Sequence, residues 1–260
     1  MKKFLILVFF GYVLFNFFKE ENSVETIQDS KPMVSYAFRG VDNSWPLLPE
    51  TENQVAAQLD LKNYYLIFDG SGSMKESECS NNSSKLAVAK TAVTEFIKKI
   101  PANANIGFSV FDYSGASERV ALATHSQANI ITEIDGVRAS GTTPLRTAIK
   151  DAFSALNQQA IKQLGYGEYH LIVITDGQAS DNEDPTDMVQ LMLEKSPVVL
   201  HTIGFCIDGS HSLNQTGLTL YKAANNPAEL SSGLDAVLAE SADFAVDSFD
   251  DTAVTGAMPE

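Results

Sequence analysis

The chain has 260 residues, of which 44% are apolar and 20% are charged, a balance typical of a globular protein with its own core and unlike that of a disordered chain. Its net charge of −15 comes from 18 basic and 33 acidic residues, which argues against nucleic-acid binding and disfavours docking on anionic lipid. Acidity alone selects neither a fold nor a partner.

The first eighteen residues form a separate segment. Lys2 and Lys3 precede the uncharged, mostly apolar residues 4–18, and Glu20 and Glu21 follow soon after. A basic start, an apolar stretch and then acid is typical of an export segment whose lysines stay in the cytoplasm. The stretch is short for a membrane span, which needs about 20 residues, but no small-x-small cleavage site and no lipid-carrying cysteine follows it. We therefore expect an uncleaved anchor rather than a cleaved signal peptide. Either one places the rest of the chain in the cell envelope, in the periplasm or at the cell surface.

Residues 19–60 have no clear period and contain three prolines, so we interpret them as a tether that is partly ordered near the single Trp45. From residue 61, apolar runs of strand length alternate with helical periodicity. The expected strands are Tyr64–Asp69, Asn105–Phe111, Arg119–Ala123, Tyr169–Thr175, Val198–Phe205 and Leu218–Ala223, and the expected helices are Ser83–Ile100, Asn129–Val137, Pro144–Leu164, Asp187–Lys195 and Pro227–Glu240. We expect one domain over residues 61–241 and a loosely held acidic tail over 242–260.

The alternation of strands and helices predicts an α/β domain with a doubly wound, mostly parallel sheet of six strands and helices on both faces. In such sheets, functional sites form where loops leave the carboxyl ends of the strands. Asp69 ends one apolar strand and Asp176 follows another, so both carboxylates are expected at this edge. Ser71 and Ser73 in the loop after Asp69, and Thr143 at the start of a helix, add hydroxyl groups nearby.

Carboxylates and hydroxyls without histidine or cysteine form an oxygen-only set, which suits a hard cation. Two acids with three hydroxyls fit Mg²⁺ or Mn²⁺ better than Ca²⁺, which prefers more ligands at longer distances. Gly70 and Gly72 are expected to let the backbone turn so that the side chains of Asp69, Ser71 and Ser73 face one point. Taken alone, the loop after Asp69 is also compatible with a tight turn in which Asp69 caps a helix.

Three stretches together resemble the metal-ion-dependent adhesion site of the von Willebrand factor type A family. They occur in the family's order, as DGSGSM at 69–74, TTPL at 142–145 and ITDG at 174–177. The resemblance implies that the three hydroxyls bind the metal directly and the two acids directly or through water, the residues being Ser71, Ser73, Thr143, Asp69 and Asp176. It covers about Lys62 to Glu240 and implies one short antiparallel edge strand, which would be Arg119–Ala123. Thr143 is preferred to Thr142 because it directly precedes the proline that starts the helix.

Two cysteines, Cys79 and Cys206, follow the first site stretch and the fifth expected strand. Both are expected near the carboxyl edge of the sheet. In an oxidising compartment an even number of cysteines permits a disulfide. The sequence leaves open whether they pair or remain two free thiols.

By the same resemblance, the leading hypothesis is a protein-binding, adhesion-type module. Its cation keeps one position open for an Asp or Glu carboxylate of a partner protein. We expect no enzymatic activity. A metal-assisted hydrolase needs a positioned base beside an activated water, and the sequence offers no base–nucleophile pair. The one candidate base is His211, in a loop at the same edge. A regulatory or assembly partner of a chaperone-type ATPase is a further alternative, against which the export segment argues. His170 and His201 lie in expected buried strands and are interpreted as core residues.

Overall fold

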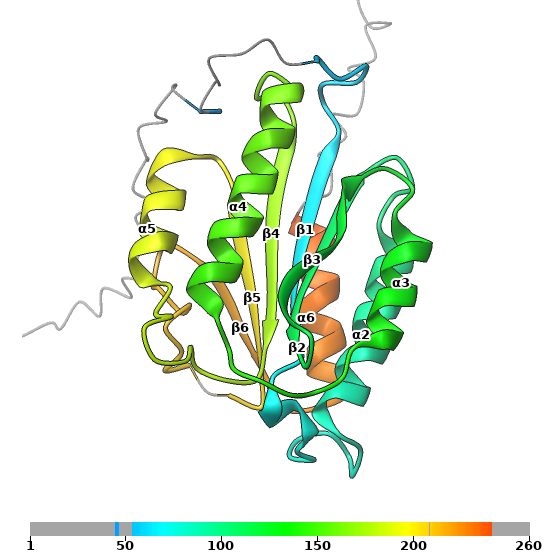
Figure 1. Ribbon diagram of the computed structural model, residues 1–260, viewed down its shortest axis with the longest axis vertical. Helices are drawn as coiled ribbons and strands as arrows, with labels where there is room; N and C mark the ends of the chain where they lie inside the picture. Colours follow the sequence, from blue (N-terminus) through cyan, green and yellow to red (C-terminus); the bar gives the residue numbers. More distant parts are fainter. Residues whose placement is uncertain (1–44, 47–53, 208, 241–260) are drawn as a thin grey trace, which may run out of the picture. The chain divides into compact units, whose positions relative to one another are not determined.

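The structure is a computed structural model that describes residues 45–46, 54–207 and 209–240 (Figure 1). The expected export segment 1–18, most of the expected tether 19–60 and the expected tail 242–260 lie outside the described residues. Within the described ranges, no helix is both long enough and apolar enough to cross a membrane.

The domain is a six-stranded sheet flanked by helices (Figure 1). Its strands are β1 (Lys62–Asp69), β2 (Asn105–Asp112), β3 (Gly115–Ala123), β4 (Glu168–Thr175), β5 (Val199–Phe205) and β6 (Leu220–Ala224). They lie in the order β3-β2-β1-β4-β5-β6, and only the β2–β3 pairing is antiparallel. The predicted fold class is confirmed, including the antiparallel edge strand.

Helices cover both faces of the sheet. They are η1 (Gly72–Lys75), α2 (Lys85–Lys99), α3 (Gln127–Gly136), α4 (Leu145–Lys162), α5 (Thr186–Lys195) and α6 (Pro227–Glu240). Alternate residues of β1 point to opposite faces, so Leu66 packs in a core with α2, α3 and α6, while Ile67 packs in a second core with α4 and α5. Two apolar cores thus hold β1 and its neighbour β4 in the middle of the molecule.

Several element boundaries differ from the expectation. β3 begins at Gly115, four residues before the expected Arg119, because a tight hairpin pairs Gly115 with Asp112 and carries the backbone ladder through exposed polar residues. Residues 72–75 form a short 3-10 helix in what was expected to be an irregular loop. Pro144 precedes α4 as its capping residue, whereas it was expected at the first helical position.

Two local contacts fix the chain at the last helix and just before the domain, and the second confirms the expected order near Trp45. Asn226 caps α6, because its side-chain oxygen accepts a hydrogen bond of 2.9 Å from the amide of Glu229, and the Glu229 carboxylate accepts one from the amide of Asn225. Trp45 is ordered and packs edge-on against Tyr169 with 4.8 Å between ring centroids. The chain just before the domain is therefore attached to it at this point.

Candidate metal centre

The two predicted acids lie side by side at the carboxyl edge of the sheet. Asp69 is the last residue of β1, Asp176 directly follows β4, and these two strands are neighbours. Both side chains are buried, and the Oδ2 atom of Asp69 accepts a hydrogen bond of 2.6 Å from the hydroxyl of Thr175. Thr175 was not singled out in the sequence, where a threonine that ends a buried strand carries no special signal.

The loop after β1 turns its first residues back onto Asp69. The amide of Gly70 donates to the Phe111 carbonyl at 2.9 Å, and the amide of Ser71 donates to Oδ1 of Asp69 at 2.7 Å. A Cβ on Gly70 would lie 2.8 Å from side-chain atoms of Asp112 and Val137, so Gly70 is required by close packing. Gly70 and Gly72 do not adopt the left-handed backbone, so the expectation that their conformational freedom turns the loop was wrong.

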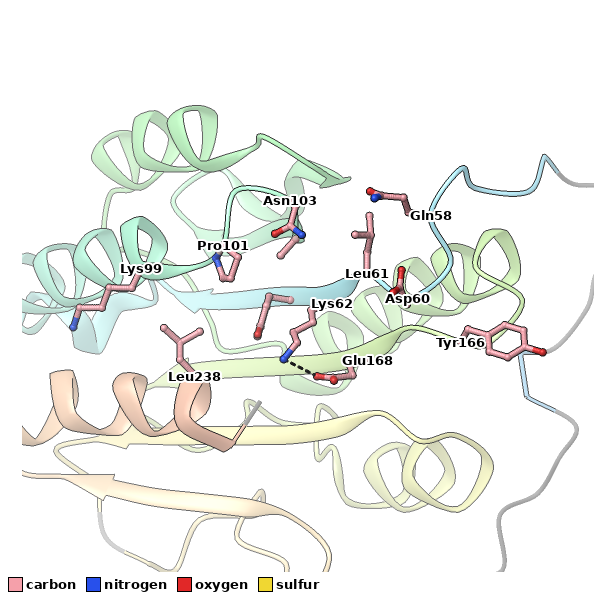
Figure 2. Close-up of a pocket in the computed structure, with 12 residues that line it drawn as sticks. Gln58, Asp60, Leu61, Lys62, Lys99, Pro101, Asn103, Tyr166, Glu168 and Leu238 are labelled. Carbon is pink, nitrogen blue, oxygen red and sulfur yellow. Dashed lines mark ion pairs between the residues drawn. The ribbon is translucent and has the colours of Figure 1, made fainter. Parts of the chain in front are cut away.

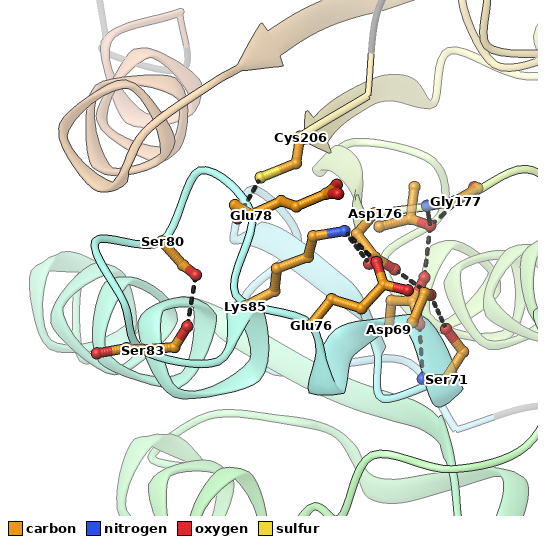
Figure 3. Close-up of polar contacts among 12 residues, drawn as sticks. Asp69, Ser71, Glu76, Glu78, Ser80, Ser83, Lys85, Asp176, Gly177 and Cys206 are labelled. Atoms are coloured by element: carbon orange, nitrogen blue, oxygen red, sulfur yellow. Dashed lines mark hydrogen bonds and ion pairs between the residues drawn. The ribbon is translucent and has the colours of Figure 1, made fainter.

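The hydroxyls of the loop link the two acids. The Oγ atoms of Ser71 and Ser73 lie 3.0 Å apart, and the Ser73 hydroxyl donates to Oδ1 of Asp176 at 2.7 Å. Figure 3 shows Asp69, Ser71 and Asp176 converging on one region between the loop and the strand ends. Four of the five predicted residues therefore form one continuous hydrogen-bonded chain.

The fifth, Thr143, is brought to this region by its backbone. The amide of Ser140 donates to the Gly70 carbonyl at 2.8 Å, and the amide of Gly72 donates to the Gly141 carbonyl at 3.2 Å, so the loop before α4 is fastened to the loop after β1. Thr143 is buried, while Thr142 is exposed. The Thr143 hydroxyl makes no hydrogen bond within the part of the chain that the structure describes, which leaves the Thr143 oxygen available as a ligand.

A buried lysine, not foreseen from the sequence, completes the cluster. Lys85 begins α2 and is only 3% exposed, and its Nζ lies 3.1 Å from Oδ2 of Asp176 and 3.1 Å from Oε2 of Glu76 (Figure 3). Burial favours a lower pKa for Lys85, but the bonds to Asp176 and Glu76 outweigh it and raise the pKa above its usual value. A lysine at the start of an amphipathic helix gives no sequence signal that it will be buried.

Burial also acts on Asp69. The pKa of this carboxyl is raised to about 6, chiefly by burial and also by the nearby charge of Asp176, while the hydrogen bonds from Thr175 and Ser71 oppose the rise. The centre therefore holds two buried acids against one buried lysine, with the half-exposed Glu76 at its margin. This excess of negative charge favours a cation.

The donor set fits a divalent cation bound by oxygen. Within the described residues, no three His, Cys, Asp or Glu side chains come together as a metal-binding group, so a cation here needs the hydroxyls. Four of the predicted oxygen-bearing residues are linked at the sheet edge, and the loop that carries Thr143 is fastened beside them, an oxygen-rich arrangement of the kind that Mg²⁺ prefers. Metal binding by each of these side chains stays a prediction.

His211 lies at the same edge but is not placed as a base. Its Nδ1 accepts a hydrogen bond of 2.9 Å from the amide of Leu213, so the proton is on Nε2, which donates to the Gly177 carbonyl at 2.8 Å. The ring is buried, and burial lowers its pKa. Both nitrogens thus have structural partners.

The cysteines meet near the centre as two free thiols. Cys206 donates a hydrogen bond of 3.0 Å from its Sγ to the carbonyl of Glu78, the residue before Cys79 (Figure 3). The expectation that both lie at the carboxyl edge is confirmed in position.

A pocket of about 680 Å³ lies at the opposite, amino edge of the sheet (Figure 2). The ion pair between Lys62 and Glu168 crosses its wall, with 3.5 Å between the charged atoms. It contains none of the residues of the candidate metal centre.

Comparison with protein families agrees with this geometry. The family model of the von Willebrand factor type A domain matches residues 63–253. The chain belongs to this family. None of the curated proteins matches the sequence.

Solved structures share the fold at low sequence identity. An aerotolerance-related membrane protein from Bacteroides fragilis is 16% identical with a TM-score of 0.51, over 68% of this chain and 96% of that one. The pilus adhesin SpaC from Lactobacillus rhamnosus GG is 16% identical with a TM-score of 0.55, over 73% and 31%. Proximal thread matrix protein 1 from the mussel byssus, with a zinc-occupied adhesion-site motif, is 17% identical with a TM-score of 0.56, over 70% and 48%.

Proposed function

We propose that this von Willebrand factor type A domain binds a divalent cation, Mg²⁺ in preference to Mn²⁺ or Ca²⁺, and uses it to hold a carboxylate of a partner protein. The observation that carries the proposal is the hydrogen-bonded chain from Asp69 through Ser71 and Ser73 to Asp176. Ser71, Ser73 and Thr143 would contact the cation directly, and the two acids directly or through water. The bound cation would be an electrophile with one open coordination position, which a carboxylate of the partner protein would fill.

The charge distribution within the centre supports a carboxylate partner. Hydroxyls are neutral ligands, and Lys85 already neutralises part of the charge of Asp176, so the cation would keep much of its positive charge. The protein's overall net charge of −15 opposes an acidic partner at long range. Salt screens that repulsion beyond about 8 Å, so the local attraction of the cation decides at contact.

We propose that the domain acts in the cell envelope, outside the cytoplasm. The support is the apolar segment at residues 4–18 with lysines before it and acids after it. An aerotolerance-related membrane protein and a pilus adhesin share the fold, which is compatible with this location. Protease added to intact cells or spheroplasts should digest the domain. If it were reached only after lysis, a cytoplasmic role beside a chaperone-type ATPase would replace this one.

We propose a binding role without catalysis, because both ring nitrogens of His211, the one histidine at this edge, are hydrogen-bonded to the backbone. Its ring nitrogens bond Leu213 and Gly177, which leaves no lone pair to activate water. Metal-dependent hydrolysis of generic esters or phosphoesters, lost in Asp69→Ala, would overturn this part of the proposal.

The test of the proposal is a crosslinked pull-down with the full-length protein in detergent from envelope extract. It is run with Mg²⁺, with EDTA and with Asp69→Ala, and Glu194→Ala on the exposed surface of α5 serves as the matched control. We expect a partner retained with Mg²⁺ and by the control, and lost with EDTA and with Asp69→Ala. A partner that binds equally in all samples would refute the metal-bridged mechanism.

A further inference from the structure

The fold brings Cys79 and Cys206 together from segments far apart in the chain. Cys79 lies in the loop between η1 and α2, and Cys206 directly follows β5. The Glu78 carbonyl that accepts from the Cys206 Sγ at 3.0 Å belongs to the peptide that joins Glu78 to Cys79. Peptide geometry therefore puts this Sγ within about 6 Å of the Cys79 Cα. The Cys79 side chain is near enough to contribute to the raised pKa of the Cys206 thiol.

Both cysteines adopt a backbone conformation that is unfavourable for residues other than glycine. Their φ angles are +54° and +60°, in the left-handed region. Asparagine and aspartate tolerate this region because their side chains bond the local backbone, and cysteine lacks that compensation. Both side chains are half-buried and pack against the same apolar core, the one formed with α2, α3 and α6. Two strained backbone positions at two neighbouring cysteines are the kind of local strain that is typical of functional positions.

We propose that Cys79 and Cys206 form an intramolecular disulfide that ties the loop between η1 and α2 to the end of β5. The reaction requires neither a metal nor a partner protein, so it does not depend on the proposed binding function. An extracytoplasmic location would supply the oxidising conditions in which such a bond persists.

The bond forms by exchange with a small disulfide such as oxidised glutathione. The Cys79 thiolate attacks one glutathione sulfur, a mixed disulfide forms, and the first glutathione leaves as a thiolate. Cys206 then loses its proton and its sulfur attacks the Cys79 sulfur, which releases the second glutathione. Two cysteine thiols are oxidised, and one glutathione disulfide is reduced to two thiols.

The surroundings assign the order of attack. Cys79 lies in a turn whose neighbours Ser77 and Glu78 are exposed, so a small disulfide can reach it. The Cys206 thiol is engaged with the Glu78 carbonyl, and burial together with Cys79 raises its pKa to about 12. Cys79 is therefore the attacking thiol and Cys206 the resolving one.

The crosslinked loop is the one that places Lys85 beside the candidate metal centre. The amide of Lys85 donates to the Glu76 carbonyl at 2.7 Å, which closes the loop of residues 76–85, and the Lys85 ammonium group bonds Asp176. A disulfide from Cys79 to Cys206 would attach this loop to the end of β5, at a point away from the Lys85–Glu76 hydrogen bond. The disulfide is thus a brace for the loop that carries the centre's counter-charge.

The experiment equilibrates reduced full-length protein with equal concentrations of reduced and oxidised glutathione, followed by alkylation and peptide mass spectrometry. We expect a Cys79–Cys206 crosslinked peptide, with most molecules protected from alkylation. Cys206→Ser should accumulate a mixed disulfide with glutathione at Cys79, because the resolving thiol is gone. Cysteines that stay fully alkylatable, or wild-type protein that carries only glutathione, would overturn the proposal. This first readout needs no variant to fold.

The brace is measured separately on the same samples. Oxidation should raise the Tm of the wild type by about 5–10 °C and leave Cys79→Ser/Cys206→Ser unchanged. Amide hydrogen exchange should slow at residues 76–84 and stay unchanged in the β2–β3 hairpin. An oxidised protein with unchanged Tm and exchange would contradict the bracing role. Mg²⁺ titration of the same samples reports metal binding by itself, so failure of the disulfide and failure of the proposed binding function are distinguishable.

Discussion

Two buried polar clusters lie at opposite ends of the same central strands, β1 and β4. At the carboxyl edge, Asp69 and Asp176 face Lys85 and a row of hydroxyls. At the amino edge, His170 and His201 form a pair with 3.1 Å between Nδ1 and Nε2. Both clusters are shielded from water, but they differ in charge.

The amino-edge cluster is neutral at its centre and closed. The side-chain amide nitrogen of Asn63 donates to the carbonyls of Leu61 and Glu168, and its oxygen accepts from Asn105, all within 2.9 Å. Burial lowers the pKa of His170 and lowers that of His201 to about 3, so both rings are uncharged at neutral pH. The carboxyl edge instead keeps an excess of negative charge and the hydroxyl of Thr143, which has no hydrogen-bond partner among the described residues. The amino-edge cluster therefore fastens strands to each other, whereas the carboxyl-edge cluster keeps the charge and the hydroxyl that the proposed cation would use.

The largest expected effect comes from removing the buried lysine of the carboxyl edge. Lys85→Met should lower the free energy of unfolding by about 3 kcal/mol in EDTA, because Asp176 is left buried without its counter-charge. Mg²⁺ should restore part of this loss, since the cation supplies positive charge to the same acid. Urea unfolding with and without Mg²⁺ measures both effects.

The matched control for Lys85 is Lys98→Met on the same helix. Its ion pair with Glu95 is more than half exposed on both sides, so we expect a change below about 0.5 kcal/mol. Equal losses in the two variants would mean that burial of Lys85 does not matter to the centre.

The next effect tests the openness of the carboxyl edge. Thr143→Val keeps the shape of the side chain and removes its hydroxyl, so the Mg²⁺ dissociation constant should rise about 100-fold, which corresponds to about 2.7 kcal/mol. Thr142→Val removes an exposed hydroxyl one residue away and should leave Mg²⁺ affinity unchanged. Isothermal titration calorimetry on the full-length protein measures the Mg²⁺ dissociation constants of both variants. A loss of Mg²⁺ affinity in the Thr142 variant alone would mean that Thr142, and not Thr143, is the metal ligand.

The smallest effect concerns the neutrality of the amino edge. The folded-state pKa of His201, about 3, lies below its unfolded value of about 6.5, so the unfolded chain binds more protons as the pH falls. The stabilising effect of a neutral His201 is complete above about pH 6.5 and is lost progressively toward pH 3. From pH 7 to pH 5, wild type should lose about 1–2 kcal/mol more stability than His201→Gln. The half-exposed carboxylates of Glu168 and Glu240, which face the two rings, moderate the loss.

This difference between wild type and variant isolates the histidine from the opposite edge. The raised pKa of Asp69 acts with the reverse sign, because its folded form takes up a proton first and gains stability as the pH falls below about 6. That contribution is common to both proteins and cancels. His125→Asn, at an exposed position, is the control and should follow the wild type. Parallel pH profiles for wild type and His201→Gln would contradict a neutral, closed amino edge.

Much of the fold could be predicted because its signals are local. The unbroken apolar run before Thr175 predicts a buried parallel strand, and Asn226 with Glu229 three residues later predicts a helix start. The start of β3 could not be predicted, since its first residues are exposed and carry no apolar strand pattern, and they are strand only because they pair with β2. The role of Gly70 was also hidden, because its neighbours Asp112 and Val137 come from other elements.

The fold class and the oxygen-bearing residues at strand ends follow from local sequence patterns, because apolar periodicity and turn residues act over a few positions. The ion pair of Lys85 with Asp176, the contact of Cys206 with the loop of Cys79 and the pairing of His170 with His201 instead depend on the tertiary structure. Each of these pairs joins residues far apart in the chain, and their contact depends on strand order and helix packing. The same packing removes water, which changes the charge states and reactivity of these groups from what the residue types alone imply.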